Sequence, residues 1–147
     1  MSNKIWEFTG ETKIHFGTTL KRIRAAVGFK LKCGIVIVKG ELGGWIEKES
    51  NLSGNAWVYG DAKVSGNAEV YGDARVESSE DYCVYKNTWS SFRWFTYTRS
   101  NKMWSVGCFH GTGAGLIAKA YKDSEKSGKC YEAIVKAQEA IEKEMEM

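Results

Sequence analysis

The chain has 147 residues, of which 27% are charged and 43% hydrophobic, and a formal net charge of +3. This length suits one ordinary domain, or one core with two small flanking units. No apolar run approaches the roughly 20 residues of a membrane-spanning helix, and Met1 to Phe8 lacks the apolar core of a secretory signal. We therefore expect a cytoplasmic protein that does not enter a membrane.

Charge is unevenly distributed along the chain. The net charge is +5 in residues 1–45, −4 in residues 46–80, +3 in residues 81–112 and −1 in residues 113–147. Two basic segments thus flank an acidic middle.

The first 45 residues predict a small β unit. Residues 4–8 and 13–16 read as two strands around a turn at 9–11, followed by a third strand. The continuous apolar, β-branched run at 35–38 predicts a buried strand rather than a helix. We expect residues 1–45 to form an N-terminal β-cap.

A period of six governs the middle of the chain. A small residue stands two positions before most of the aliphatic residues of this pattern. Gly-Asn or Gly-Asp pairs provide the bends, because these residues tolerate positive φ. The pattern predicts a parallel β-solenoid of about two coils in residues 46–80. The aliphatic positions are Ile46, Leu52, Val58, Val64, Val70 and Val76.

With three hexads to a coil, residues eighteen apart in sequence should pair. Trp45 would then stack over Lys63 and Trp57 over Arg75, as aromatic-cation ladders. A solenoid of only two coils cannot bury its own two ends. The flanking segments, or another subunit of a dimer or trimer, must therefore cover these ends. Aromatic residues of the coils either stiffen this unit or form a partner surface. They are Trp45, Trp57, Tyr59 and Tyr71.

The repeats Trp57-Val-Tyr-Gly-Asp-Ala62 and Glu69-Val-Tyr-Gly-Asp-Ala74, preceded by Gly40-Glu-Leu-Gly-Gly-Trp-Ile-Glu47, carry a family likeness. The segment from 18 to 80 resembles the hexapeptide-repeat, left-handed β-helix proteins, and more narrowly short accessory proteins of phages and prophages. The stretch from 92 to 131 is similar to the end of those phage proteins. The resemblance implies a left-handed helix and a role in host interaction.

Many hexapeptide-repeat proteins are acyl- or nucleotidyltransferases with a histidine base on a loop near the coils. Here both histidines, His15 and His110, lie outside the repeats, and the coils carry no loop insertion. An acyltransferase, which would be a trimer that binds coenzyme A, is therefore the second alternative.

The four cysteines are scattered and lack Cys-x-x-Cys spacing, so we expect reduced core thiols, no metal and no cofactor. Cys108 and His110 could supply two zinc ligands, but a structural zinc needs four and the sequence offers no second pair.

The last 67 positions, residues 81–147, predict a strand at 82–85, a hairpin of 92–99 with 103–109, and two helices after a glycine-rich turn. Basic and aromatic residues alternate on the hairpin, a pattern that suits a nucleotide, a protein partner or merely a solvated strand. The turn itself is a weak phosphate signal. The candidate binding residues are Arg93, Tyr97, Arg99, Lys102, Trp104, His110 and Thr112.

The sequence therefore predicts a mainly β protein with C-terminal helices: a short left-handed parallel β-helix, an N-terminal β-cap, and a C-terminal β-hairpin with two helices. No catalytic carboxylate pair or nucleophile-histidine arrangement emerges, so we expect no enzyme. The expected function is that of a phage-encoded protein that inhibits a bacterial defence system, anti-CRISPR-like or other, by binding one of its protein components. The alternative is a sponge that sequesters a nucleotide signalling molecule.

Overall fold

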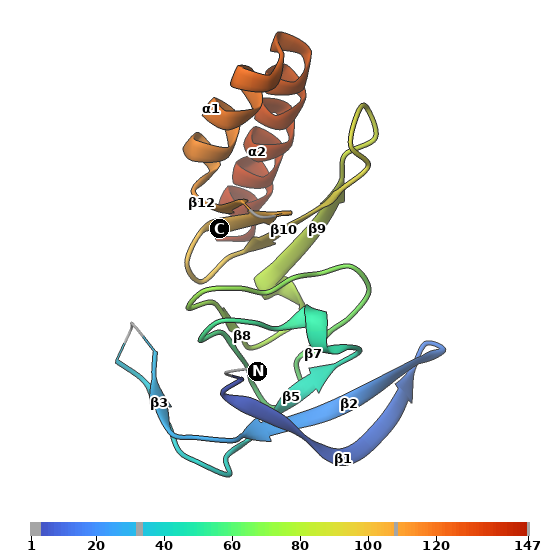
Figure 1. Ribbon diagram of the computed structural model, residues 1–147, viewed down its shortest axis with the longest axis vertical. Helices are drawn as coiled ribbons and strands as arrows, with labels where there is room; N and C mark the ends of the chain where they lie inside the picture. Colours follow the sequence, from blue (N-terminus) through green and yellow to red (C-terminus); the bar gives the residue numbers. More distant parts are fainter. Residues whose placement is uncertain (1–3, 32–33, 108, 147) are drawn as a thin grey trace.

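The computed structural model describes residues 4–31, 34–107 and 109–146, which form an elongated molecule (Figure 1). A twisted sheet from the N-terminal part lies at one end and a helical hairpin at the other. The periodic segment, residues 46–80, lies between them.

Twelve strands and two helices are distributed over these residues. The N-terminal strands are β1 (Trp6–His15), β2 (Thr18–Ala25), β3 (Phe29–Lys30), β4 (Val36–Ile37) and β5 (Leu42–Ile46). The periodic segment holds β6 (Trp57–Val58), β7 (Lys63–Val64) and β8 (Arg75–Val76), with 3-10 turns η1 (Glu49–Asn51) and η2 (Ser79–Asp81). The C-terminal elements are β9 (Tyr82–Lys86), β10 (Trp94–Thr98), β11 (Met103–Val106), β12 (Phe109–Gly111), α1 (Gly113–Asp123) and α2 (Glu125–Met145).

The predicted fold class, a left-handed parallel β-helix, is wrong. The strands form four small separate sheets, ordered β1-β2-β5-β7, β12-β11-β10-β9, β3-β4 and β6-β8. The first of these is mixed and the second is antiparallel. Glycines with φ between 46° and 76° interrupt the periodic segment every six residues, so its strands are only two residues long and cannot extend into continuous parallel sheets.

The eighteen-residue offset within the periodic segment is nevertheless confirmed. Trp45 pairs with Lys63, Trp57 pairs with Arg75, and Leu52 bridges to Val70, all in parallel. The two tryptophan rings, however, contact other residues than the expected cations Lys63 and Arg75. Lys13 Nζ lies 4.2 Å from the centroid of the Trp45 ring, and the Trp57 ring packs edge-on against Phe29.

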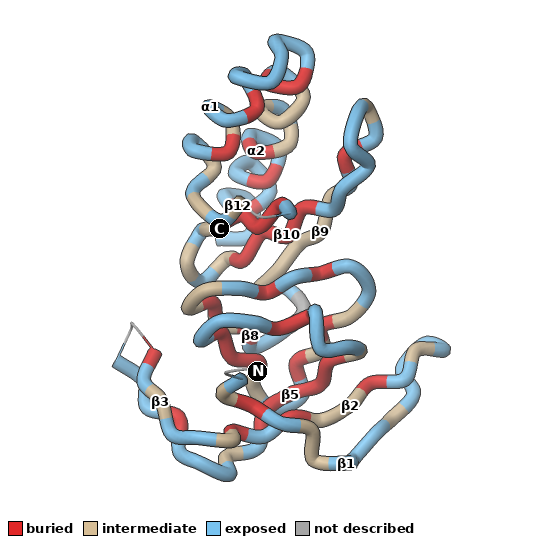
Figure 2. The backbone as a smooth tube through the Cα atoms, viewed as in Figure 1, coloured by how far each residue is buried: buried red, intermediate tan, exposed pale blue. Residues whose placement is uncertain are grey.

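The six periodic aliphatic side chains form the centre of the main core, each at most 2% exposed (Figure 2). Gly43 and Gly44 let β5 approach this core closely, since a Cβ at either position would lie within 2.9 Å of neighbouring atoms. The same core contains Trp6 and Ile23, so the β1–β2 hairpin is anchored on the periodic segment.

Asn51 turns inward at η1 and is fully buried. Its Oδ1 accepts hydrogen bonds from the backbone N–H of Glu47 (3.2 Å) and Lys48 (2.9 Å). Its Nδ2 donates to the carbonyls of Gly66 (3.2 Å) and Ala68 (2.9 Å). One side chain therefore bonds four backbone groups at this corner, of which the N–H of Glu47 also donates to the Val64 carbonyl at 3.1 Å.

Replacing Asn51 by alanine should lower the free energy of unfolding by about 2 kcal/mol, because one buried hydrogen bond, to the Ala68 carbonyl, and three partly buried ones are lost. Urea unfolding of Asn51→Ala measures the loss. The exposed Asn67→Ala is the matched control and should stay within about 0.5 kcal/mol of the parent. Equal stability of the two variants would contradict the assigned role.

The N-terminal hairpin differs from the prediction. The turn expected at 9–11 is an irregularity inside the continuous strand β1, where the register shifts between Phe8 and Thr12. Gly10, with φ of 92°, absorbs the bulge, and the chain reverses later, at Phe16-Gly17. The expected buried strand at 35–38 is also shorter, since β4 buries only Ile37.

The C-terminal strand and two helices are present, and the hairpin pairs β10 with β11. Its second arm is shorter than predicted: it ends at Val106, and Phe109 belongs to β12, which pairs antiparallel with β11. One face of β10 carries Phe95 and Tyr97 into a second core with Leu116 of α1 and Val135 of α2. The other face covers the periodic segment, where the Thr96 hydroxyl accepts from the N–H of Glu69 (2.7 Å). No helix within the described residues is long and apolar enough to cross a membrane.

Candidate functional site

Four residues predicted to bind a nucleotide or partner do come together. Side chains from the hairpin and the start of α1 line a cavity of about 440 Å³ against α2, namely Tyr97, Lys102, Trp104 and Thr112. Three carboxylates, Glu139, Glu142 and Glu146, line the same cavity and offset its two lysines. Thr112 Oγ1 already accepts from the N–H of Gly115 (3.1 Å) as the N-cap of α1. This cavity is poorly suited to a phosphate group.

Glu142, only 6% exposed, holds two of these residues, Tyr97 and Lys102, together. Its carboxylate accepts from the Tyr97 hydroxyl at 2.7 Å and lies 3.2 Å from Lys102 Nζ and 3.5 Å from Arg99 Nε. Burial, and then the hydrogen bond to Glu142, raise the pKa of the Tyr97 hydroxyl well above its ordinary value. The cluster attaches α2 to the sheet.

His110 lies in another cavity, of about 530 Å³, between the periodic segment and the C-terminal sheet. Its ring stacks on Tyr71 with centroids 3.6 Å apart, and its Nδ1 is 3.1 Å from Ser105 Oγ. This serine-histidine contact, which the sequence did not predict, is a cross-strand pair of β11 and β12. The Ser105 hydroxyl orients the imidazole ring against Tyr71.

The predicted aromatic partner surface does not form. Trp57 is fully buried, Trp45 is 5% exposed, and the half-buried Tyr59 packs against the main core. Tyr71 alone is exposed, and its ring is occupied by His110. Trp45, Trp57 and Tyr59 are thus taken up in packing inside the protein.

The cysteines that the structure describes, Cys83 and Cys130, are free and half-buried. Burial raises the pKa of the Cys83 thiol, which lowers its reactivity. Cys33 and the proposed zinc ligand Cys108 lie outside the described residues.

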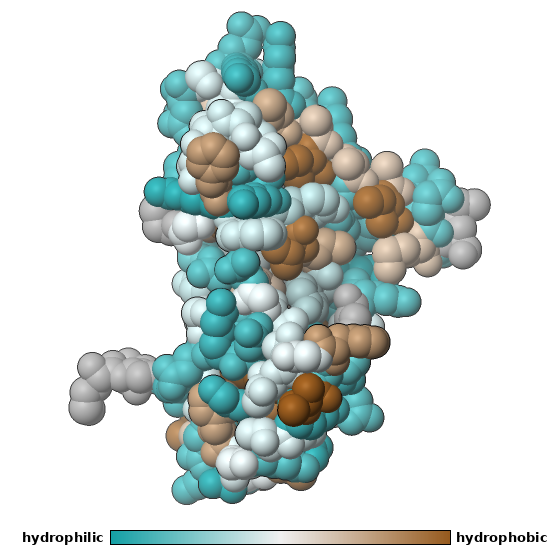
Figure 3. Space-filling view, turned by 90° about the vertical axis from the view of Figure 1, so that its right-hand side faces the viewer, coloured by the Kyte–Doolittle hydropathy of each residue, from teal (hydrophilic) through white to brown (hydrophobic). Residues whose placement is uncertain are grey.

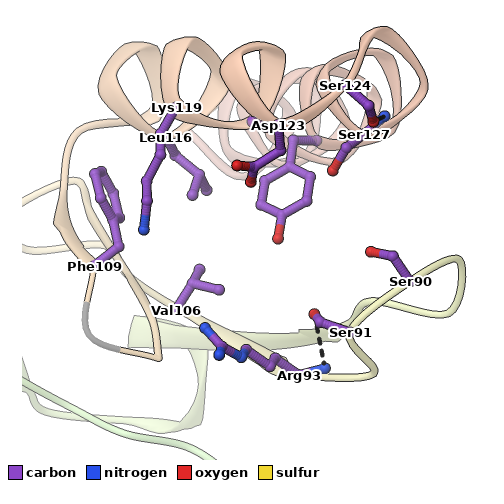
Figure 4. Close-up of a pocket in the computed structure, with 12 residues that line it drawn as sticks. Ser90, Ser91, Arg93, Val106, Phe109, Leu116, Lys119, Asp123, Ser124 and Ser127 are labelled. Atoms are coloured by element: carbon purple, nitrogen blue, oxygen red, sulfur yellow. Dashed lines mark hydrogen bonds between the residues drawn. The ribbon is translucent and has the colours of Figure 1, made fainter.

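Arg93, the remaining predicted residue, is exposed and lines a third cavity, of about 310 Å³, beneath the two helices (Figure 4). Lys119 extends into this cavity from α1 above, and the Arg93 side chain runs along its lower edge from the end of the β9–β10 loop.

The most unusual exposed feature is the tip of the β1–β2 hairpin. His15 pairs with Thr18 and encloses the two-residue loop Phe16-Gly17, in which φ is 47° at Phe16 and 81° at Gly17. Positive φ at both positions is the type I′ pattern, which favours Asn-Gly. A bulky residue in the left-handed region is strained by about 1–2 kcal/mol. Phe16 is nevertheless 95% exposed, and its neighbour on the hairpin, Ile14, is 76% exposed.

The surroundings of this tip are basic. Lys13 and Lys21 lie on the same hairpin with their ammonium groups over the rings of Trp45 and Phe8. The hairpin's carboxylates, Glu7 and Glu11, are each occupied by an arginine. The tip is therefore apolar with a cationic base.

A second loop also exposes a phenylalanine that has positive φ. Phe92 has φ of 58° and is 62% exposed in the β9–β10 loop, which projects toward the same side of the molecule as the hairpin tip (Figure 1). Figure 3 shows that this face carries separate apolar patches among hydrophilic atoms. Neither phenylalanine is marked as a site by the sequence pattern around it. The one usable signal was the Phe16-Gly17 step between two β-type runs.

Comparison of the chain with protein-family models, with curated proteins and with solved structures found no match. The candidate site therefore has to be interpreted from its own geometry.

Proposed function

We propose that this protein is a non-enzymatic binding protein that inhibits a bacterial defence system by inserting the Phe16 tip of its β1–β2 hairpin into one of the system's protein components. The observation that carries the proposal is the strained, almost fully exposed Phe16.

The first support for the proposal is that the backbone strain at Phe16 is not offset by any burial of its side chain in the free protein. The ring of Phe16 contacts His15 edge-on, with centroids 4.4 Å apart, and gains no burial. Residues held in rarely populated backbone regions cluster where ligands bind, because the strain is offset in the complex. An aromatic anchor that enters a partner's pocket is a common energetic centre of protein interfaces.

The charge around the tip indicates the chemistry of the partner. Lys13 and Lys21 surround the base of the hairpin, so the complementary surface is an apolar pocket with acidic residues at its rim. Such complementarity would raise the association rate and make it sensitive to salt.

The family resemblance of residues 18–80 to phage accessory proteins directs the search for the partner. A phage protein that acts in the host cytoplasm without catalysis meets host proteins there, and components of defence systems are the targets whose inhibition benefits a phage. An exposed aromatic tip of the kind that anchors protein interfaces is compatible with this role.

Photo-crosslinking tests the proposal. Benzoylphenylalanine is placed at position 16 in bacteria that carry a defence system which the protein inhibits in a plaque assay. We expect one crosslinked host protein from that system, and the same residue placed at Val38, which is 62% exposed on another loop, should give none. Equal crosslinking from both positions, or crosslinking only to unrelated proteins, would refute the proposal.

A further inference from the structure

We infer that the cavity beneath the two helices is a binding site for a small organic phosphate monoester. Its boundaries come from three parts of the chain: the β9–β10 loop, the β11–β12 strands, and the α1–α2 junction (Figure 4). The site lies at the opposite end of the molecule from the Phe16 tip, and the inference does not depend on the proposed function.

Two cations line the cavity, and neither has a carboxylate partner among the described residues. Within residues 4–31, 34–107 and 109–146, neither Arg93 nor Lys119 forms an ion pair. Lys119 Nζ lies 5.6 Å from the ring centroid of Phe109, which is also part of the lining. Asp123 is the one carboxylate among the lining residues, so the cavity carries a net positive charge.

The hydroxyl groups of the lining are arranged as donors. Asn87, 1% exposed, fixes the loop: its Oδ1 accepts from the N–H groups of Trp89 and Ser90, both at 3.0 Å, and its Nδ2 donates to Ser91 Oγ at 3.0 Å. Ser91 Oγ also accepts from the N–H of Arg93 at 3.4 Å. Because that oxygen accepts twice, its proton is left to donate.

Two more hydroxyl groups of the lining, those of Ser124 and Tyr131, also have a proton left to donate. Ser124 Oγ accepts from the N–H of Ser127 at 3.0 Å. The Tyr131 hydroxyl lies 3.5 Å from Asn87 Nδ2, whose two hydrogens are closer to Ser90 Oγ (3.1 Å) and Ser91 Oγ (3.0 Å). The protons of the Ser124 and Tyr131 hydroxyls are likewise available to a ligand. Three hydroxyl donors and two cations in one cavity match a ligand that is rich in acceptors and anionic.

The remaining lining and the size of the cavity narrow the ligand class. Val106, Phe109 and Leu116 form an apolar wall beside the donors. The volume of about 310 Å³ is at the small end of ligand sites. A monoester with one phosphoryl group and one apolar or aromatic group fits both properties, with the phosphoryl oxygens at Arg93, Lys119 and Ser91.

Isothermal titration of the full chain with phenyl phosphate tests the inference. We expect saturable binding, weaker binding of inorganic phosphate, and none of phenol. Arg93→Gln and Lys119→Gln should each weaken phenyl phosphate binding about ten- to hundredfold, the usual loss for a hydrogen bond to a charged group. Asp123→Asn should strengthen it.

The matched control is Lys122→Gln, an exposed lysine of the same helix outside the lining, which should bind phenyl phosphate like the parent. Circular dichroism verifies that each variant is folded. No saturable binding to the parent, or an equal loss in Lys122→Gln and Lys119→Gln, would overturn the inference.

Discussion

Replacing Phe16 by asparagine should make the protein more stable and abolish the proposed inhibition. Asn-Gly is the preferred type I′ pair, so Phe16→Asn relieves the left-handed strain at the tip and should raise the free energy of unfolding by about 1 kcal/mol. The same change removes the aromatic anchor. Urea unfolding and plaque formation on bacteria that carry the inhibited defence system measure the two effects, which we expect to have opposite signs.

Two matched variants separate these effects. Phe16→Tyr keeps an aromatic ring and should retain most of the inhibition. Val38→Thr removes an exposed apolar side chain elsewhere and should leave inhibition unchanged. If Phe16→Asn inhibited as well as the parent, the tip would not be the binding site, whatever its stability.

Replacing Glu142 by alanine should cause the second large effect, a loss of about 2–3 kcal/mol in the free energy of unfolding. The Tyr97 hydroxyl, on a residue 5% exposed, would lose its acceptor. Lys102 is 66% exposed and stays solvated, so its ion pair contributes little to this estimate. Urea unfolding followed by tyrosine and tryptophan fluorescence measures the loss.

A double-mutant cycle identifies the cause of that loss. Glu142→Ala and Tyr97→Phe should be non-additive, because each removes one partner of the same hydrogen bond. Glu144→Gln, an exposed position on the same helix, should stay within about 0.5 kcal/mol of the parent. Additive effects of the first two substitutions would show that the Tyr97–Glu142 bond is not what stabilises α2 on the sheet.

The sequence predicted local structure better than global architecture. The hairpin of residues 92–109 and the two helices follow from alternation and from apolar spacing, which depend on neighbours in the chain, and all are present. The fold class failed because the pattern of six specifies which side chains turn inward but not how far each strand extends. Gly60 and Gly66, both with positive φ, lie two positions beyond the ends of the two-residue strands β6 and β7.

The candidate sites were predicted only in part. Tyr97, Lys102, Trp104 and Thr112 do converge, but the carboxylates that occupy the same space come from α2, whose packing on the sheet no local pattern specifies. Arg93 lines a donor-rich cavity whose other cation, Lys119, is 26 positions further along the chain. Phe16 could not be predicted as a site, because its exposure and its φ are properties of the folded hairpin.

The sequence by itself determined the buried aliphatic positions from Ile46 to Val76, the pairing of residues eighteen apart, and the C-terminal hairpin and helices. These depend on periodicity and on turn residues, which act over a few positions of the chain. Only the tertiary structure decided that the strands form four separate sheets, that Trp45 and Trp57 are buried, and that Phe16 and the Arg93 cavity are accessible. Exposure and convergence depend on how distant segments pack, because a side chain is buried or left free by the elements that cover it.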